Sequence, residues 1–165
     1  MDILRLAPVY DIKWSVNLEK RVFAPKKVAY LKYGLGTQSM SVVSRQNLID
    51  FINHRLNQEI NTSQSGLKNK FCNVFNVCDK KNYRFIEIIR VFKKSDHQPN
   101  RCVLFVPLSF VKLVTRLAGL IFKRKRKWLH SNYDKLACSL VIDNTKMLET
   151  GFMPKHSLES VFFED

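Results

Sequence analysis

Glycine, proline and acidic residues are scarce in this chain of 165 residues. It has only five glycines and five prolines, which excludes collagen-like and low-complexity segments rich in these residues. Asp and Glu together number 14 against 28 Lys and Arg, so the net charge is +14. With 45% hydrophobic residues, the composition predicts one globular domain or subdomain. The charge predicts attraction to polyanions, which include nucleic acid, phosphate-bearing small molecules and acidic membranes.

The cysteines form no metal-binding or disulfide pattern. No C-x-x-C pair occurs, and no histidine stands at zinc-site spacing from a cysteine. We therefore expect free, mostly buried thiols, no metal site and a cytoplasmic location. Asp2 stands where a signal peptide has basic residues, so no secretion signal is expected. The four cysteines are Cys72, Cys78, Cys102 and Cys138.

The most apolar stretch, residues 102–122, lacks the uniform character of a membrane span. Pro107 separates a strand-like part from a helix-like part, and polar or small residues recur along one side of the latter. These residues are Lys112, Thr115, Arg116, Gly119 and Lys123. The pattern predicts an amphipathic helix, because charges near the centre of a membrane span are costly. Membrane-surface contact through this helix and the basic run after it stays open.

The basic run Lys123–Lys127, followed by Trp128, is the densest group of positive charge. A run of this kind fits a nucleic-acid patch as well as a solvated face. The sequence has no aromatic RNP motif, no GXXG loop and no zinc-finger spacing around it. Nucleic acid is therefore not the expected partner.

Strand-like and helix-like segments alternate along the chain, which favours an α/β or α+β arrangement. Predicted strands cover 2–10 with a break near Pro8, then 28–33, 39–43, 71–77, 102–106 and 140–142. Predicted helices cover 14–22, 44–58, 82–94, 108–122, 145–149 and a last helix from 157. Residues 57–69 are predicted to form a polar loop. The expected N-caps are Ser44, Asn82, Asp143 and Ser157.

The segment from Ser139 to Phe162 carries the most specific pattern. A short apolar run precedes a short helix that Gly151 ends, and Pro154 stiffens the link to a last helix. This order resembles the closing segment of NAD-dependent nucleotide-sugar epimerases and dehydratases, in the extended short-chain dehydrogenase/reductase family. The residues on the pattern are Asp143, Thr145, Lys146, Gly151, Phe152, Pro154, Ser157, Leu158 and Glu159.

Two further segments fit the same resemblance. A core strand of the family reads L-R-x-x-N-V-Y-G, and this chain matches it at Leu4, Arg5, Val9 and Tyr10, with Pro8 and Asp11 as departures. The helix pattern N-L-[IV]-D is met by Asn47–Asp50.

The turn after residue 33 fits the family only in part. Gly34, Gly36 and Gln38 match a G-x-G-x-Q-x-R turn that lies over the nucleotide, but Met40 replaces the phosphate-binding arginine. A thioether cannot hold phosphate as a guanidinium does. The turn is also no dinucleotide-binding loop, because Ser39 occupies the third glycine position and an extended segment follows.

The resemblance implies an α/β fold that forms the C-terminal part of an extended short-chain dehydrogenase, with late Rossmann strands and a small α/β substrate-binding subdomain. Residues 1–165 would then be the substrate-binding half of an epimerase/dehydratase-like protein. The sequence has neither the glycine-rich NAD loop nor a Tyr-x-x-x-Lys pair. We therefore assign no catalytic residue and expect this chain alone to be inactive, although a full-length relative would use NAD.

The resemblance also implies a binding site, which we carry over residue by residue. Asn17 and Leu18 would touch the diphosphate of a nucleotide sugar, Leu31 and Tyr33 would surround the base, and Gln38 would belong to the turn. Three basic residues would replace the missing arginine as point charges, namely Arg21, Lys32 and Lys135. The residues expected beside the nicotinamide end of NAD are Leu6, Ala7 and Pro8.

The expected partners follow from this interpretation. They are a nucleotide-sugar substrate such as a UDP-sugar and the missing N-terminal Rossmann half, and a homodimer stays open. Two alternatives also stay open. One is a binding or scaffold protein with an inactive epimerase-like fold, and the other is a non-catalytic, basic protein that binds nucleic acid or a membrane surface.

Overall fold

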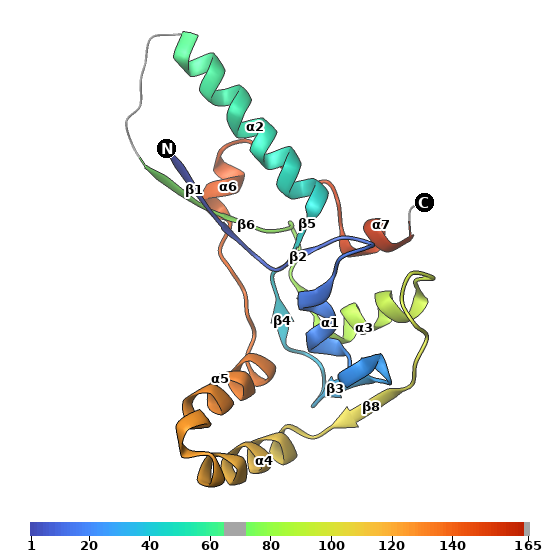
Figure 1. The fold of residues 1–165 in the computed structure, drawn as a ribbon. Helices are drawn as coiled ribbons and strands as arrows, with labels where there is room; N and C mark the ends of the chain where they lie inside the picture. The colour runs from blue at the N-terminus through green and yellow to red at the C-terminus, as the bar shows by residue number, and fades with distance from the viewer. Residues whose placement is uncertain (65–71, 164–165) are drawn as a thin grey trace. The chain divides into compact units, whose positions relative to one another are not determined.

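The computed structural model of the protein describes residues 1–64 and 72–163. Within them the chain divides into two compact units, each built from segments far apart in sequence. Unit 1 comprises Met1–Ser15, Ser41–Asn82 and Ile142–Asp165. Unit 2 comprises Val16–Met40 and Tyr83–Val141. Each unit is described separately, and Figure 1 labels most of the elements of both.

Unit 1 combines short parallel strand pairs with helices. Its strands are β1 (Asp2–Leu6), β2 (Val9–Tyr10), β5 (Val43–Ser44) and β6 (Asn73–Val77). Its helices are α2 (Arg45–Gln64), α6 (Thr145–Glu149) and α7 (Leu158–Phe163). Strand β1 pairs in parallel with β6 in the register Asp2↔Asn73 to Leu6↔Val77, and β2 pairs in parallel with β5. Parallel pairing of strands distant in sequence is typical of α/β folds.

The core of unit 1 lies where α2 packs against β6 and the closing segment. The ring of Phe51 meets Phe75 edge-on at a centroid distance of 5.6 Å and Phe152 at 5.2 Å. Burial of these rings supplies much of the hydrophobic stabilisation of the unit. Other buried members of this cluster are Ala7, Val43, Val77, Cys78 and Met147.

Unit 2 contains one parallel and one antiparallel strand pair and most of the helices. Its strands are β3 (Tyr30–Tyr33), β4 (Ser39–Met40), β7 (Tyr83–Arg84) and β8 (Val103–Val106). Its helices are α1 (Val16–Val22), α3 (Phe85–Lys94), α4 (Leu108–Ile121) and α5 (Arg126–Ala137), with 3₁₀ turns η1 (Pro25–Lys27) and η2 (Lys123–Lys125). Strand β3 runs parallel to β8, and β4 runs antiparallel to β7. The core includes Phe23, which stacks on Tyr30 at 4.4 Å.

The predicted α/β fold class is confirmed, and so are several local signals. Ser44 caps α2 because its Oγ accepts a hydrogen bond from the Asn47 N–H at 3.0 Å. Ser157 caps α7 in the same way through the Ser160 N–H at 3.1 Å. Gly151 follows α6 with φ of +82°, a conformation that glycine adopts without strain.

Two predictions about α2 were wrong. The helix continues to Gln64, so the predicted loop 57–69 is helical in its first part, and its remainder lies outside the described residues. The predicted apolar face was Leu48, Ile49, Ile52 and Leu56. Leu48 is partly buried and packs against the core as predicted, but Ile49, Ile52 and Leu56 are exposed, whereas Phe51 is fully buried. The aromatic ring and the polar contacts of Asn47 fix the buried side of the helix about one residue away from the predicted one.

Three smaller predictions also need correction. Asn82 does not cap α3, because its Oδ1 accepts a hydrogen bond from Ser41 Oγ at 2.6 Å. The predicted strand 140–142 is reduced to a single bridge between Leu140 and Met40. The four cysteines are free as predicted, but only Cys78 is buried.

Helix α4 confirms its predicted span but not its predicted orientation. Thr115 and Gly119, which belong to the predicted polar stripe, are buried, while most large apolar side chains of the helix are exposed. Gly119 lies against α5, since a Cβ added there would be 3.3 Å from Cγ of Arg126. Small residues let the two helices approach closely, so they form the contact face in place of the apolar stripe. Helix α5 itself was not predicted.

Among residues 1–64 and 72–163, no helix has the length and apolarity needed to cross a membrane.

Candidate functional site

All eight residues assigned to substrate binding by resemblance belong to unit 2. Helix α1 carries the first three. Asn17 is exposed, Leu18 is fully buried in the core, and Arg21 is half-buried. The side chain of Leu18 therefore cannot reach a ligand, and only its backbone is available for such a contact.

Arg21 and Lys135 lie next to each other although 114 positions separate them in sequence. The Arg21 guanidinium donates a hydrogen bond from Nη1 to the backbone oxygen of Lys135 at 2.9 Å. Burial lowers the pKa of the Arg21 guanidinium below its ordinary value, but an arginine remains charged at neutral pH. Helix α1 and the last turn of α5 thus bring the Arg21 guanidinium to the backbone of a second basic residue.

Strand β3 holds the next three residues on alternating sides. Leu31 and Tyr33 share one face and Lys32 projects from the other, because successive side chains of a strand point in opposite directions. Burial raises the pKa of the half-buried Tyr33 above its ordinary value of 10.0, so its ring and hydroxyl are neutral. The strand does not bring Lys32 and Tyr33 to the same face, and Lys32 Cγ lies near Gly36.

The turn after β3 is held by backbone hydrogen bonds. The Gly36 N–H donates to Tyr33 O at 3.0 Å, and the Phe85 N–H donates to Gln38 O at 3.0 Å. Gly36 has φ of +68°, and an added Cβ would come within 3.3 Å of Ile86. Gln38 Oε1 is buried and has no hydrogen-bond partner among residues 1–64 and 72–163. A buried acceptor without a partner is costly, and a ligand donor at this position would satisfy it.

The charges in this region are not neutralised within the part of the chain that the structure describes. The ion pairs found in residues 1–64 and 72–163 do not include Arg21, Lys32 or Lys135. Met40, which replaces the family's arginine, is fully buried in the core and cannot contact an anion. Basic side chains that form no ion pair within the protein are suited to binding a phosphate group. These binding roles remain predictions.

Leu6, Ala7 and Pro8 lie in unit 1, at the carboxyl end of β1 and in the link to β2. Leu6 is exposed and Ala7 is buried, with its N–H donating to Val77 O at 3.0 Å. Pro8 O accepts a hydrogen bond from the Val43 N–H at 3.1 Å. In open α/β sheets, ligands bind outside the carboxyl ends of parallel strands, so the place is suitable for the proposed cofactor contact.

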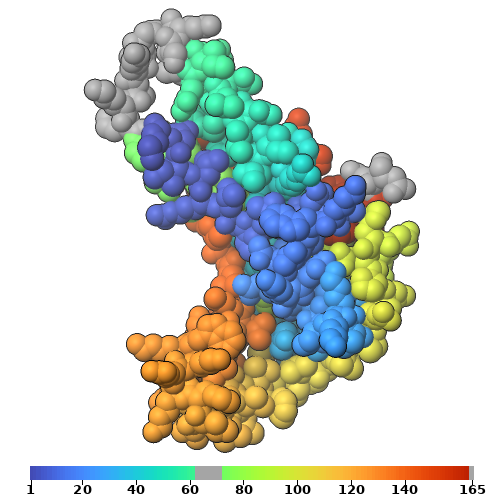
Figure 2. Space-filling model, viewed as in Figure 1, coloured from blue at the N-terminus to red at the C-terminus, as the bar shows by residue number. Residues whose placement is uncertain are grey.

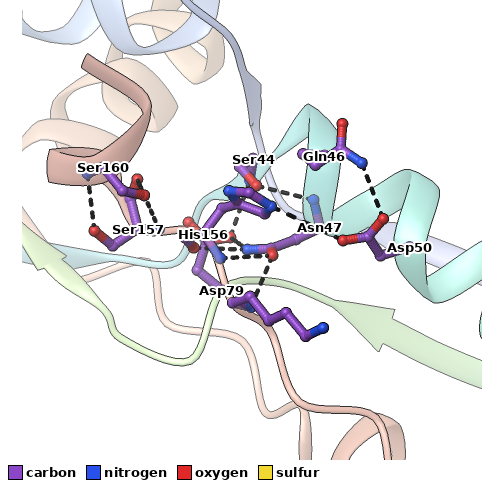
Figure 3. A network of polar contacts seen from close by, with 9 residues as sticks. Ser44, Gln46, Asn47, Asp50, Asp79, His156, Ser157 and Ser160 are labelled. Atoms are coloured by element: carbon purple, nitrogen blue, oxygen red, sulfur yellow. Dashed lines mark hydrogen bonds and ion pairs between the residues drawn. The ribbon is translucent and has the colours of Figure 1, made fainter. Parts of the chain in front are cut away.

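Unit 1 also contains a buried polar network that the sequence did not predict. Asp79 accepts hydrogen bonds from Tyr10 Oη at 2.7 Å, the Ser44 N–H at 2.9 Å and Asn47 Nδ2 at 2.7 Å. Asn47 continues the network to the closing segment: Nδ2 also donates to His156 O at 2.7 Å, and Oδ1 accepts from the N–H groups of Lys155 and His156, each at 3.0 Å. Figure 3 shows these contacts around Asn47.

The network is structural in its geometry. Burial raises the pKa of the Asp79 carboxyl, and the three hydrogen bonds act in the opposite direction. Asn47 was noticed in the sequence as part of N-L-I-D, but its partners come from segments as much as 109 positions away. The side-chain donors and backbone contacts are internal, so this group holds the closing segment onto α2 and is not available for chemistry.

The described residues do not fit the main binding site for NAD. The Gly34–Gly36 turn leads into β4 rather than into a helix N-terminus, so it forms no cradle of free N–H groups for a pyrophosphate. Its N–H groups are used internally, since Gly34 donates to Val106 O and Gly36 to Tyr33 O. In the same described residues, no group of three or more His, Cys, Asp or Glu side chains could hold a metal ion.

Comparisons with known proteins identify similar folds. UDP-glucuronic acid 4-epimerase from Bacillus cereus, solved in complex with NAD, has a TM-score of 0.57 and 15% identity, covering 98% of this chain and 41% of that chain. Human epimerase family protein SDR39U1 (isoform 2), solved with NADPH, has a TM-score of 0.54 and 16% identity, covering 99% of this chain and 47% of that chain.

The present chain therefore spans less than half the length of either solved chain. No protein-family model and no curated protein sequence matches it. An identity of 15–16% establishes similarity of fold alone. The chain thus has an α/β fold similar to that of part of these two solved structures.

Proposed function

We propose that this chain is the nucleotide-sugar-binding, C-terminal half of an NAD-dependent epimerase/dehydratase, of the kind that acts on UDP-sugars. The observation that carries the proposal is that the Arg21 guanidinium lies against the backbone of Lys135, and that neither residue forms an ion pair among the described residues. It is supported by the fold-level likeness to an epimerase whose name specifies a UDP-sugar.

The proposed roles follow from the chemistry of each group. Arg21 and Lys135 would neutralise the diphosphate, with Asn17 as a hydrogen-bonding neighbour on the exposed side of α1. Tyr33 would stack on the base or border it, and the unpartnered Gln38 Oε1 would accept a hydrogen bond from a ligand N–H or O–H. Leu31 would line the same face as Tyr33.

The chemistry of a hydride transfer would need groups outside this sequence. NAD would accept and return the hydride in the complete protein, and a tyrosine–lysine pair would move the proton. The present chain would position the nucleotide part of the substrate. Leu6, Ala7 and Pro8 would border the cofactor from the carboxyl end of β1.

The test is a titration of the 165-residue chain with UDP-glucose, in which calorimetry measures the binding affinity. The double variant Arg21→Ala with Tyr33→Ala removes one charge-assisted contact and one ring, so binding should weaken by at least about tenfold. The matched control reverses the charges at 123–127, which should leave binding within about twofold. Thermal melts of both variants verify folding, since Arg21 also contacts α5.

The opposite pattern would place the site elsewhere. If the variant of the basic run loses UDP-glucose binding and the Arg21/Tyr33 variant keeps it, the proposed site is wrong. If the unmodified chain shows no saturable binding of UDP-glucose or UDP at millimolar concentrations, the proposal that this half holds the nucleotide is rejected.

A further inference from the structure

Helix α4 exposes the apolar surface that an amphipathic helix usually buries. Its large apolar side chains recur at helical spacing and are between 48% and 75% exposed. They are Phe110, Leu113, Val114, Leu117, Leu120 and Ile121. In an isolated globular unit such a continuous apolar stripe is unfavourable, which indicates that a partner covers it.

The packing of α4 against α5 explains why this stripe faces outward. The helices meet at Gly119, where Arg126 packs over the glycine, and the small Thr115 one turn earlier in α4 is also buried. Turning the apolar stripe toward α5 would put bulky side chains where a Cβ already comes within 3.3 Å of Arg126. The outward orientation is therefore set by close helix contact and does not depend on a few flexible side chains.

Positive charge borders this apolar stripe without any acidic residue. Lys112 and Arg116 lie one helical turn apart along its edge, and both are exposed. The basic run Lys123–Lys127 follows at the end of α4, and Trp128 beside it is 64% exposed. Between Asp96 and Asp134 the sequence contains eight Lys and Arg and no Asp or Glu.

We propose that α4, η2 and the start of α5 form a docking surface for an anionic lipid bilayer, with the apolar stripe of α4 inserted among the acyl chains and Lys123–Lys127 on the headgroups. Two kinds of contact are needed, apolar and anionic, and a bilayer with acidic lipids offers both in one plane. In Figure 2 the atoms of α4 and α5, coloured gold to orange, form an outer surface of the chain.

The dimensions and composition fit this partner. Helix α4 has 14 residues, or about 21 Å at 1.5 Å per residue, which is suitable for lying in an interface and too short for a hydrocarbon core of about 30 Å. A tryptophan next to the basic run is typical of the headgroup level. A protein partner would need an apolar groove for the stripe and acidic groups for seven basic side chains. The centres of protein interfaces are depleted of lysine, so this surface is less suited to a protein than to a bilayer.

The experiment is co-sedimentation of the 165-residue chain with vesicles of phosphatidylcholine, alone and mixed with phosphatidylglycerol. We expect binding to the mixed vesicles at least about tenfold stronger than to the neutral ones, and weaker at high salt. The apolar variant is Leu113→Gln, Leu117→Gln and Leu120→Gln, and the charge variant is Lys123→Gln, Lys125→Gln and Lys127→Gln. Each should reduce binding to mixed vesicles by at least about tenfold.

Matched controls come from helix α2 and from another basic site. Ile52→Gln, Leu56→Gln and Ile60→Gln replace exposed apolar residues of α2, and Lys93→Gln with Lys94→Gln removes exposed charge from α3. These controls should leave vesicle binding within about twofold. All substituted side chains are exposed, so the variants are expected to fold, and circular dichroism verifies this.

Three results would overturn the proposal. The first is equal binding of the unmodified chain to neutral and mixed vesicles, or none to either. The second is vesicle binding that survives both the apolar and the charge variants. The third is self-association in sedimentation that the apolar variant abolishes while vesicle binding stays unchanged, which would identify a second copy as the occupant. The proposal is independent of UDP-glucose binding, which the apolar variant should leave intact.

Discussion

Replacing Asn47 with alanine tests the claim that one amide holds the closing segment onto helix α2. Asn47 is almost fully buried, and its side chain makes four hydrogen bonds: two to the backbone N–H groups of Lys155 and His156, one to His156 O and one to Asp79. Alanine removes all of them while keeping helix propensity at least as high. The loss therefore reports on the network alone.

The expected cost follows from the kind of each bond. The bond to Asp79 involves a carboxylate and is worth roughly 1.5–3 kcal/mol, and each neutral bond is worth roughly 1 kcal/mol. Water can reach the backbone of the exposed Lys155 and the half-buried His156 in the variant, which recovers part of the sum. We therefore expect Asn47→Ala to lower the free energy of unfolding by about 3 kcal/mol, with a melting temperature about 6–12 °C lower for a chain of this size.

The assay is urea unfolding monitored by circular dichroism, with hydrogen exchange as a local readout. The matched control is Gln46→Ala, because Gln46 is the exposed neighbour with a single hydrogen bond to Asp50 at 2.9 Å. The control should change the free energy of unfolding by no more than about 0.5 kcal/mol. In Asn47→Ala the amides of Lys155 and His156 should also exchange much faster, since their acceptor is gone.

A specific outcome would refute this reasoning. If Asn47→Ala and Gln46→Ala unfold at the same urea concentration, the network around Asn47 contributes nothing to stability. If stability falls but the Lys155 and His156 amides keep their protection, the closing segment is held by other contacts. In either case the structural role assigned to Asn47 would be wrong.

Two further predictions concern pH and the cofactor. Burial raises the pKa of Asp79 above its ordinary value of 3.8, so its contribution to stability is complete below pH 3.8 and is lost as pH rises through the raised pKa. The side chain of Asp79→Asn stays neutral, so the melting temperature of this variant, relative to that of the unmodified chain, should rise with pH in calorimetry. A difference that does not change with pH would contradict the raised pKa. The 165-residue chain should not bind NAD in a fluorescence titration, because its sequence has no glycine-rich loop before a helix. It should not convert a nucleotide sugar either, because it has no Tyr-x-x-x-Lys pair. Turnover by the purified chain would contradict this prediction.

Local signals predicted much of the secondary structure because their causes lie within a few residues. Ser44 and Ser157 cap helices through N–H groups three residues away. A helix was expected over residues 82–94, and in α3 the apolar residues Ile88, Ile89 and Phe92 recur at helical spacing and are all buried. In such cases the sequence neighbours alone determine the structure.

The buried faces of α2 and α4 were predicted wrongly because contacts distant in sequence decide which side of each helix is buried. An apolar stripe is normally a good guide to the buried face of a helix, but in α4 the close approach at Gly119 reverses the orientation. In α2 the buried face includes Asn47, a polar residue whose partners at Asp79 and His156 are 32 and 109 positions away. A single sequence contains no local signal for pairings at these separations.

The candidate site was also predicted in part. The resemblance placed Arg21 and Lys135 in one site, and the structure brings them together through a backbone hydrogen bond. It did not anticipate that Lys32 projects from the opposite face of β3 to Tyr33, although strand alternation predicts this once the strand is known. The residues that could act jointly on one ligand are therefore fewer than those carried over.

Strand β1 and helix α4 both expose apolar side chains, and their different chemistry indicates two different partners. Strand β1 exposes Ile3 and Leu6 and, in the described part of the chain, pairs only with β6. Parallel sheets are normally covered on both faces and extended by further strands, so this edge is suited to the Rossmann strands that we propose complete the protein. The backbone hydrogen bonds of helix α4 are formed within the helix, so it cannot add a strand to a sheet. Dense positive charge also lies next to this helix, and a strand partner would not need it. We therefore expect apolar variants of α4 to abolish vesicle binding without changing any association at β1, and variants of Ile3 and Leu6 to leave vesicle binding unchanged.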